Sequence, residues 1–234
     1  MICRYCQSPR VTKNGHIPNG KQNYRCFACN RQFVENPTPV VHSPETRAQV
    51  LAALNERMSL RGAERVFHVA RQTIARWLRE AADAVTDEEP PPPTTATSLV
   101  LELDEVWSFV QQRRQKAWLW VALERTSRRV IAWVSGDRSA HTAQALWHKL
   151  PPVYRQHSYC YTDFWQAYAA VIPAEQHSAC GKEQGQTNHS ERWNNTLRQR
   201  VGRFVRQTLS FSTCERMHVA ALTWFMYCYN LSRP

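Results

Sequence analysis

The chain has 234 residues, of which 43% are hydrophobic, so it is long enough for one large domain or two to three small ones, each with a real core. This composition excludes a disordered chain, and no apolar run approaches the roughly 20 residues of a membrane span. The formal net charge of +11 favours a polyanionic partner, because each lysine or arginine on a phosphate releases condensed counterions. A basic surface without such a partner is the alternative.

The positive charge is spread along the chain. Residues 1–89 contain 13 basic and 9 acidic residues, and residues 90–234 contain 17 and 10, so both parts are able to contact nucleic acid. The first ten residues, MICRYCQSPR, lack the apolar stretch of a signal peptide, and we expect a cytoplasmic protein. Eight cysteines in a reducing compartment indicate metal ligands or free thiols rather than disulfides.

Residues 1–36 are predicted to form a small zinc ribbon. Two Cys-x-x-Cys pairs, Cys3 with Cys6 and Cys26 with Cys29, are separated by 19 residues that include two Asn-Gly turn signals. Four thiolates brought together by a hairpin match tetrahedral structural zinc and leave no open position for catalysis. An iron site of rubredoxin type uses the same thiolates, and the spacing does not distinguish the two metals. In so small a module, metal binding supplies most of the folding free energy.

Residues 43–86 are predicted to form three helices. Pro44 stands at the first position of the first helix, and Ser59 caps the second. The residues expected to face inward are Val50, Leu51 and Leu54 in the first helix, Ala63, Val66 and Phe67 in the second, and Ile74, Trp77 and Leu78 in the third.

The third helix, which begins after Ala70, presents a polar face. The residues that we expect on this face are Arg71, Gln72, Thr73, Arg76 and Arg79. Three short helices whose last one presents arginine and glutamine are typical of a helix-turn-helix DNA-binding domain. Such units also occur as packing modules without a DNA-binding role. Residues 87–98, DEEPPPPTTATS, are predicted to be an extended linker that holds these helices away from the rest of the chain.

Residues 99–234 are predicted to form an α/β domain. We expect strands over 99–110, 116–124, 129–134 and 158–162, and helices over 139–150, 165–172, 188–205 and 215–231. This order of elements is compatible with a ribonuclease-H-like fold. The four remaining cysteines have no metal-ligand spacing and are expected to be buried small hydrophobic residues: Cys160, Cys180, Cys214 and Cys228.

Three acidic residues stand where such a fold collects its site. Asp104 lies inside the first strand, Asp163 follows the strand that ends at residue 162, and Glu191 lies in the first turn of a helix. Buried carboxylates need cations or hydrogen bonds, so these three are candidates to hold two cations about 3.5–4 Å apart. Glu102 and Glu105 flank Asp104 and compete for the ligand role. The alternative is that the acids are solvated side chains of an edge strand and a surface helix.

The helix that contains Glu191 also carries polar and basic residues. Asn194, Asn195 and Arg198 follow Glu191 by three, four and seven positions, so they share its face. A carboxylate followed by amides and a guanidinium is suited to bind a cation at one end and a DNA phosphate at the other. The alternative is a surface helix with an acid–base pair.

Several motifs together resemble one family. LDEVWSFV, YTDFWQAY and NHSERWNNTLRQR, with LSFS at 209–212, are similar to the catalytic blocks of Asp-Asp-Glu transposases of the insertion sequence one family. The two Cys-x-x-Cys pairs followed by a helix-turn-helix resemble the N-terminal half of that family. The resemblance implies a ribonuclease-H-like catalytic domain whose triad is Asp104, Asp163 and Glu191, with Arg198 as the basic residue two turns beyond the glutamate.

The resemblance also implies an activity, partners and a location. It implies a bacterial, nucleoid-associated enzyme that binds double-stranded DNA at terminal inverted repeats and at a target site, as a dimer or larger homo-oligomer. With two Mg²⁺ ions, or Mn²⁺, it would cleave the 3′ end of its element and transfer that strand to target DNA without a covalent protein–DNA intermediate. The residues alone leave two alternatives open: a non-enzymatic DNA-binding regulator, and a ribonuclease-H-like nuclease without strand transfer.

Overall fold

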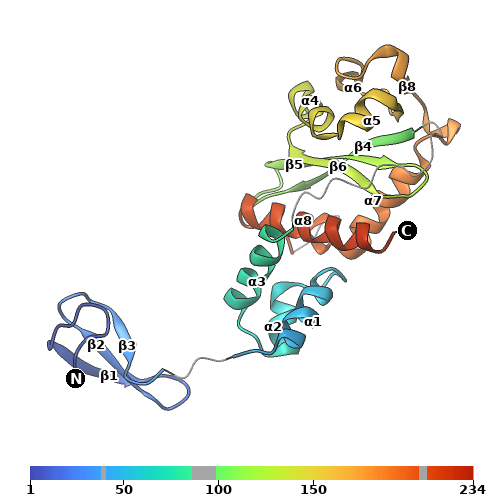
Figure 1. Ribbon diagram of the computed structural model, residues 1–234. Coiled ribbons are helices and arrows are strands. Elements are labelled where there is room, and N and C mark those ends of the chain that lie inside the picture. The colour runs from blue at the N-terminus through green and yellow to red at the C-terminus, as the bar shows by residue number, and fades with distance from the viewer. Residues whose placement is uncertain (38–40, 86–98, 206–209, 234) are drawn as a thin grey trace. The chain divides into compact units, whose positions relative to one another are not determined.

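The computed structural model describes residues 1–37, 41–85, 99–205 and 210–233 (Figure 1). They divide into two compact units, Met1–Ser43 and Pro44–Pro234, and each unit is described by itself. The predicted linker at 87–98 lies outside the described residues. Within the described ranges, no helix combines the length and the apolar character that crossing a membrane requires.

The first unit is a three-stranded antiparallel sheet. β1 (Val11–His16) pairs with β2 (Gln22–Cys26), and β2 pairs with β3 (Gln32–Val34). Gly20 has a φ of +80° in the turn between β1 and β2, a conformation that a side chain would strain. The buried residues of the described part of this unit are Phe33 and two of its cysteines. A core of this size cannot offset the entropy of ordering the chain by itself.

Three helices open the second unit, as predicted. They are α1 (Pro44–Leu54), α2 (Leu60–Phe67) and α3 (Arg71–Asp83). The Ser59 hydroxyl accepts the backbone N–H of Gly62 at 3.0 Å, which confirms the predicted cap. The prediction for Val66 is wrong: this side chain is 58% exposed, because Ala63 and Phe67 occupy the inward face of α2.

A five-stranded mixed sheet forms the centre of the second unit. Its strands are β4 (Leu99–Phe109), β5 (Lys116–Glu124), β6 (Val130–Gly136), β7 (Ser158–Thr162) and β8 (His177–Ala179). The spatial order is β6-β5-β4-β7-β8, with β5 antiparallel to β4 and β6, and with β7 parallel to β4 and β8. A three-stranded meander extended by parallel strands is the sheet of a ribonuclease-H-like fold, so the predicted fold class is confirmed.

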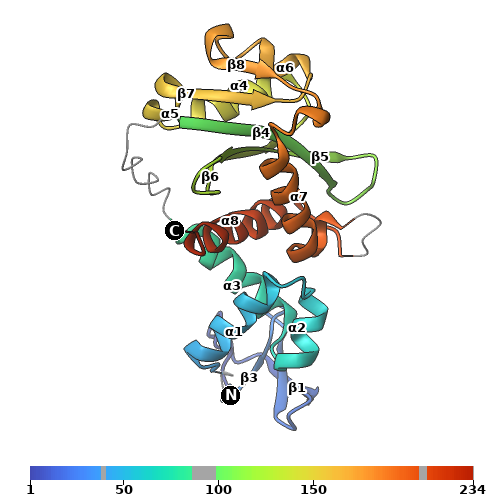
Figure 2. The same cartoon turned by 90° about the vertical axis from the view of Figure 1, so that its right-hand side faces the viewer.

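Helices cover both faces of this sheet (Figures 1 and 2). One face is covered by α4 (Ala140–Lys149), α5 (Pro152–His157) and α6 (Gln166–Ala169), and the other by α7 (Asn188–Arg200) and α8 (Glu215–Leu231). Short 3₁₀ turns lie at η1 (Ala174–Gln176), η2 (Lys182–Gln184) and η3 (Gly202–Phe204). Two predicted helices are therefore shorter than expected: α6 covers only part of 165–172, and α7 ends at residue 200 rather than 205.

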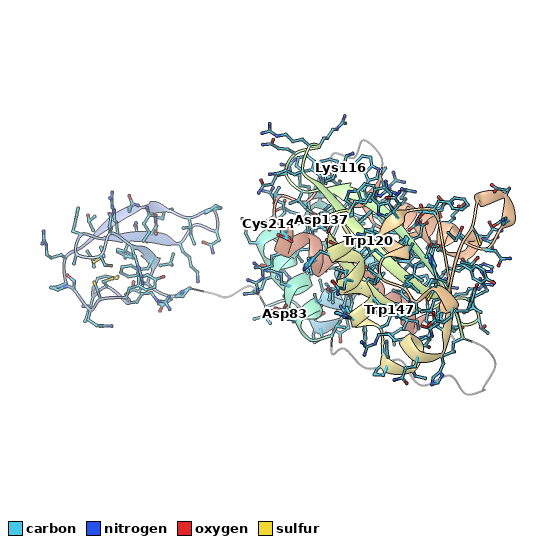
Figure 3. All side chains as sticks on the ribbon, turned by 90° about the horizontal axis from the view of Figure 1, so that it is seen from above. Asp83, Lys116, Trp120, Asp137, Trp147 and Cys214 are labelled. Atoms are coloured by element: carbon cyan, nitrogen blue, oxygen red, sulfur yellow. The ribbon has the colours of Figure 1, made fainter. Side chains whose placement is uncertain are left out.

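The two faces of β4 belong to different core layers, because successive strand residues point to opposite sides. Leu101 and Leu103 pack with α4, α5 and α6, whereas Val106 packs with α7 and α8. Trp120 of β5, labelled in Figure 3, is fully buried in the first layer, and its Nε1 donates to the carbonyl of Asp137 at 2.8 Å. The alternation places positions 102 and 104 toward α7 and position 105 toward α6.

The three N-terminal helices of this unit share a core with α8. The Nε1 of Trp224 donates to the carbonyl of Leu51 at 3.3 Å, and Met217 and Ala221 pack against the same cluster. The prediction that a linker holds these helices away from the rest of the chain is therefore wrong. The apolar face of α3, which includes Trp77 and Ala81, is wider than α1 and α2 cover, and α8 covers the remainder.

Candidate functional site

Asp104 lies in β4, and Asp163 directly follows β7, the adjoining parallel strand. The register of β4 and β7 pairs Glu102 with Tyr161, so the two aspartates, each two residues further on, come side by side at the end of β7. One carboxylate oxygen from each of Asp104, Glu105 and Asp163 lies within 4.8 Å of the others. The structure thus brings together two of the three predicted carboxylates and adds Glu105.

Both oxygens of Asp104 are oriented by hydrogen bonds. Oδ1 accepts the backbone N–H of Glu105 at 2.8 Å, and Oδ2 accepts the side-chain amide of Asn194 on α7 at 2.7 Å. Burial raises the pKa of Asp104 to about 7, and the negative charges of Glu105, Asp163 and Glu191 add to this effect. A divalent cation among these carboxylates would offset both the lost hydration and the repulsion.

Glu105 points to the opposite face and is fully engaged by the protein. Its side chain is 1% exposed; Oε1 accepts the Nε of Arg138 at 2.8 Å, and Oε2 accepts the hydroxyl of Tyr168 at 2.9 Å. The Arg138 guanidinium also lies over the rings of Trp118 at 4.7 Å and Trp165 at 4.2 Å. Glu105 therefore already has two protein partners, although one of its oxygens also lies within 4.8 Å of oxygens of Asp104 and Asp163.

Glu102 anchors α7 to the sheet. This residue is fully buried; Oε1 accepts the Nε of Arg125 at 2.8 Å, and Oε2 accepts the backbone N–H groups of His189 and Ser190 at 2.9 and 3.0 Å. A carboxylate at a helix N-terminus satisfies amides that lack helical partners and complements the helix dipole. Glu102 is therefore a positioning residue, and sequence reasoning missed this role because its partners are remote in the chain.

Glu191 stands between two attachments of α7 to β4. The attachments are the bonds from Glu102 to the start of the helix and the bond from Asn194 to Asp104. Glu191 is partly buried and lies close enough to raise the pKa of Asp104, but it is outside the group of oxygens within 4.8 Å. Two turns further along the helix lies Arg198, which is also partly buried.

The chain also matches known proteins over the part that contains these carboxylates. Residues 98–231 match the family model of the IS1 transposase. This chain belongs to the IS1 transposase family. The transposase is 33% identical over 129 residues to insertion element iso-IS1n protein InsB of Shigella dysenteriae, covering 55% of this chain and 95% of that protein.

Two further relatives give the same result. Insertion element IS1 4 protein InsB of Escherichia coli (strain K12) is 32% identical over 117 residues, which is 50% of this chain and 67% of the relative. Insertion element IS1 protein InsB of Shigella flexneri is 32% identical over 117 residues, which is 50% of this chain and 86% of the relative. Membership of a transposase family implies DNA binding, enzymatic DNA phosphoryl transfer and the use of divalent metal.

The residues predicted to contact DNA lie in two places on the transposase. On α3, Arg71, Gln72 and Arg76 are exposed and Thr73 is partly buried. Arg71 forms an ion pair with Glu64 at 2.8 Å, and Arg76 with Glu80 at 3.6 Å. On α7, Asn195 is exposed, whereas Asn194 is 7% exposed and turned toward Asp104.

The four N-terminal cysteines of the transposase form the predicted cluster. Their sulfur atoms lie within 4.8 Å of one another; Cys3 and Cys29 are 3.7 Å apart, and Cys6 and Cys26 are 3.6 Å apart. Tetrahedral zinc with bonds of about 2.3 Å requires sulfur atoms about 3.8 Å apart, so these residues fit the metal. Hydrogen bonds from the backbone of Cys29 and Ala28 lower the pKa of the Cys26 thiol to about 6, which favours the thiolate that binds metal.

Two of the other cysteines, Cys160 and Cys180, are buried as predicted. Cys228 is partly buried. The prediction is wrong for Cys214, which is exposed because it stands in extended conformation at the cap position before α8.

Proposed function

We propose that this transposase binds the terminal inverted repeats of its element, cleaves the 3′ ends and joins them to target DNA in a metal-dependent reaction. The observation that carries the proposal is the approach of Asp104 in β4 to Asp163 at the end of the adjoining strand β7, with carboxylate oxygens within 4.8 Å of each other. Two hard cations held by shared carboxylates supply an activated oxygen nucleophile and neutralise charge on the transferred phosphoryl group.

The protein orients each of these carboxylates in advance. The backbone N–H of Glu105 and the amide of Asn194 hold Asp104, and the backbone N–H of Trp165 donates to Oδ1 of Asp163 at 2.9 Å. Each bond uses one lone pair and leaves others for a cation. Glu191 completes the ligand set in this proposal, since α7 is attached to β4 on both sides of it.

The same proposal assigns the DNA contacts. Arg71, Gln72, Thr73 and Arg76 of α3 read the repeat in a major groove, because the exposed start of a recognition helix is the part that reaches base edges. The zinc ribbon and the α7 residues Asn194, Asn195 and Arg198 also contribute to DNA binding in this proposal, with Arg198 directed to phosphate near the cut. Joining two ends requires two active sites, so we propose that the working complex contains a dimer or a larger homo-oligomer.

The decisive experiment is strand cleavage and transfer with Asp163→Asn. The substrate is a duplex that carries the inverted repeat flanking the coding region, incubated with a target plasmid in Mg²⁺ or Mn²⁺. We expect the variant to lose both steps by about 10³-fold, comparable to removing a group that stabilises transition-state charge. Glu175→Gln is the matched control, because Glu175 is an exposed acid in η1 and should retain full activity.

Each other result overturns the proposal. Full activity of Asp163→Asn would remove this aspartate from the site. Cleaved DNA that is never joined by the native chain would identify a nuclease. Tight binding to the repeats with no cleavage in either metal would identify a DNA-binding regulator.

A further inference from the structure

A basic groove lies between α2 and the segment that follows α7. Its volume is about 720 Å³. The described residues that line it include no aspartate or glutamate and five arginines: Arg57, Arg61, Arg65, Arg71 and Arg203. None of the reactions or contacts assigned above uses Arg57, Arg61 or Arg65.

The arginines of α2 lack acidic partners. Arg61 and Arg65 stand one turn apart on the same face of the helix, where like charges repel. Both are exposed, and neither forms an ion pair among the described residues. In the same region, Glu64 pairs with Arg71 and Glu56 pairs with Arg200. A polyanion in the groove would reduce the repulsion between these two guanidinium groups.

The opposite wall of the groove is built by the catalytic part of the chain. The Nη1 of Arg203 donates to the hydroxyl of Ser212 at 2.7 Å, and the carbonyl of Arg203 accepts the hydroxyl of Ser108 in β4 at 2.6 Å, so this residue is fixed against the central strand. The backbone N–H of Arg57 donates to the carbonyl of Arg200 at the end of α7 at 2.7 Å. This bond joins the two walls, so the helix-turn-helix and the catalytic part form one continuous surface.

α7 also sets the distance from the groove to the carboxylates. Figure 2 shows this helix running from the sheet toward the three N-terminal helices of the unit. From Glu191 to Arg200 the helix advances about 14 Å, at about 1.5 Å per residue. For a duplex that runs alongside α7, this corresponds to about four base pairs, at about 3.4 Å each, between the carboxylates and the near wall of the groove.

We propose that the groove binds the phosphate backbone of the terminal DNA duplex about four base pairs from the cleaved end. Arginine guanidinium groups match phosphate oxygens, and the first helix of a helix-turn-helix crosses the DNA backbone. One duplex then contacts α3, the groove and the carboxylates together. The position relative to the cut rests on the proposed function, whereas backbone binding by the groove does not.

The first test measures the salt dependence of binding. We compare the native chain with Arg61→Gln/Arg65→Gln by anisotropy, using a repeat duplex and an unrelated duplex over a series of KCl concentrations without added divalent metal. The plot of log affinity against log salt concentration has a negative slope. Loss of two phosphate contacts should make this slope less steep by about 1.8. Because backbone contacts carry no sequence information, affinity should fall equally for both duplexes.

Two variants control for charge and folding. Lys149→Gln removes an exposed charge on α4, outside the groove, and should keep the native slope. Arg61→Lys/Arg65→Lys retains both charges and should retain most of the slope. An unchanged slope in the glutamine variant, or a loss confined to the repeat duplex, would overturn the proposal.

The second test locates the contact on the DNA by phosphate-ethylation interference. Ethylation about four base pairs from the cleaved end should weaken binding of the native chain but not of Arg61→Gln/Arg65→Gln. Identical interference patterns would overturn the proposed position. Neither measurement needs cleavage, so an active Asp163→Asn would refute the proposed function while leaving the groove result intact.

Discussion

The cysteine cluster and the carboxylate cluster bring their ligands together in opposite ways. Cys3 and Cys6 come from the N-terminal turn, and Cys26 and Cys29 from the end of β2 and the turn after it, beside a sheet whose apolar core is little more than Phe33. The carboxylates of the second cluster lie in β4 or directly after β7, in a sheet whose core includes Leu101 and Trp120 and is complete without them. We therefore expect metal binding to stabilise the fold of the cysteine unit. In the second unit the fold forms without metal and positions the carboxylates that bind it.

The largest effect should follow removal of metal from the cysteine cluster. Cys26→Ser, or chelation of the native chain, should unfold residues 1–37 completely, because three thiolates and this small core cannot hold the sheet. The second unit should stay folded. Amide hydrogen exchange resolves the two units: exchange of β1 to β3 should become complete within the dead time, while protection of β4 and β5 should not change. Loss of protection in both units would show that the fold of the second unit also depends on the metal of the cysteine cluster.

The next largest effect is expected for Glu102. This residue attaches α7 to the sheet by hydrogen bonds, without any metal. Glu102→Ala leaves the Nε of Arg125 and the backbone amides of His189 and Ser190 without their acceptor, although the other guanidinium nitrogens of Arg125 keep Gln186. Breaking a buried pair of this kind should lower the free energy of unfolding by about 4 kcal/mol. Urea unfolding measures the change, with Glu175→Ala as an exposed control. A loss below about 1 kcal/mol, the size expected of a surface ion pair, would contradict the anchoring role.

Acid should weaken the second unit through His218. Burial lowers the pKa of His218 to about 4, and the Arg203 guanidinium adds to the shift. As the pH falls below about 6.5, the unfolded chain takes up this proton first, so the stabilisation present above pH 6.5 is lost as the pH falls toward about 4. Between pH 7.5 and pH 5 this should cost about 2 kcal/mol. The glutamine of His218→Gln does not titrate, so the free energy of unfolding of this variant should fall by about 2 kcal/mol less between pH 7.5 and pH 5 than that of the native chain. Guanidinium unfolding measures both changes. Equal changes would show that His218 does not cause the acid sensitivity.

The smallest effect has the opposite sign. Asp163→Asn removes one of three negative groups within 4.8 Å and keeps an oxygen for the N–H of Trp165, so the metal-free variant should be more stable than the native chain by about 1 kcal/mol. Added Mg²⁺ should raise the melting temperature of the native chain but not of the variant. Calorimetry with and without Mg²⁺ checks both signs. A destabilised metal-free variant would show that this aspartate is a structural residue.

The sequence predicts the bounds of helices and strands well where the apolar pattern begins and ends with the element itself. The bounds of β5, β7 and α8 match the predicted ranges because apolar runs begin and end at polar segments. The end of α7 was predicted too late for a physical reason. Leu197, Val201 and Phe204 keep helical spacing and share one core layer, yet Val201 is extended, with φ −107° and ψ 101°. Periodicity therefore indicates which side is buried, not that the helix continues.

The candidate site was predictable only in part. The Cys-x-x-Cys spacing was enough to predict the cluster of four cysteines, because each pair is brought together by residues adjacent in the chain. The choice among Glu102, Asp104 and Glu105 depends on which helices cover each face of β4, and those helices follow much later in the sequence. Glu102 and Glu105 prove to be engaged by Arg125 and Arg138, partners that no local pattern indicates.

The sharing of α8 between two cores has a consequence for shorter products of the same coding region. A polypeptide that stops before the sheet would retain α1, α2 and α3 but lose Met217, Ala221 and Trp224, and so would present the apolar flank of α3 to water. Such a fragment would gain stability by self-association through that flank. A shortened chain of this kind would then be an oligomer, held together by the surface that α8 covers in the intact second unit.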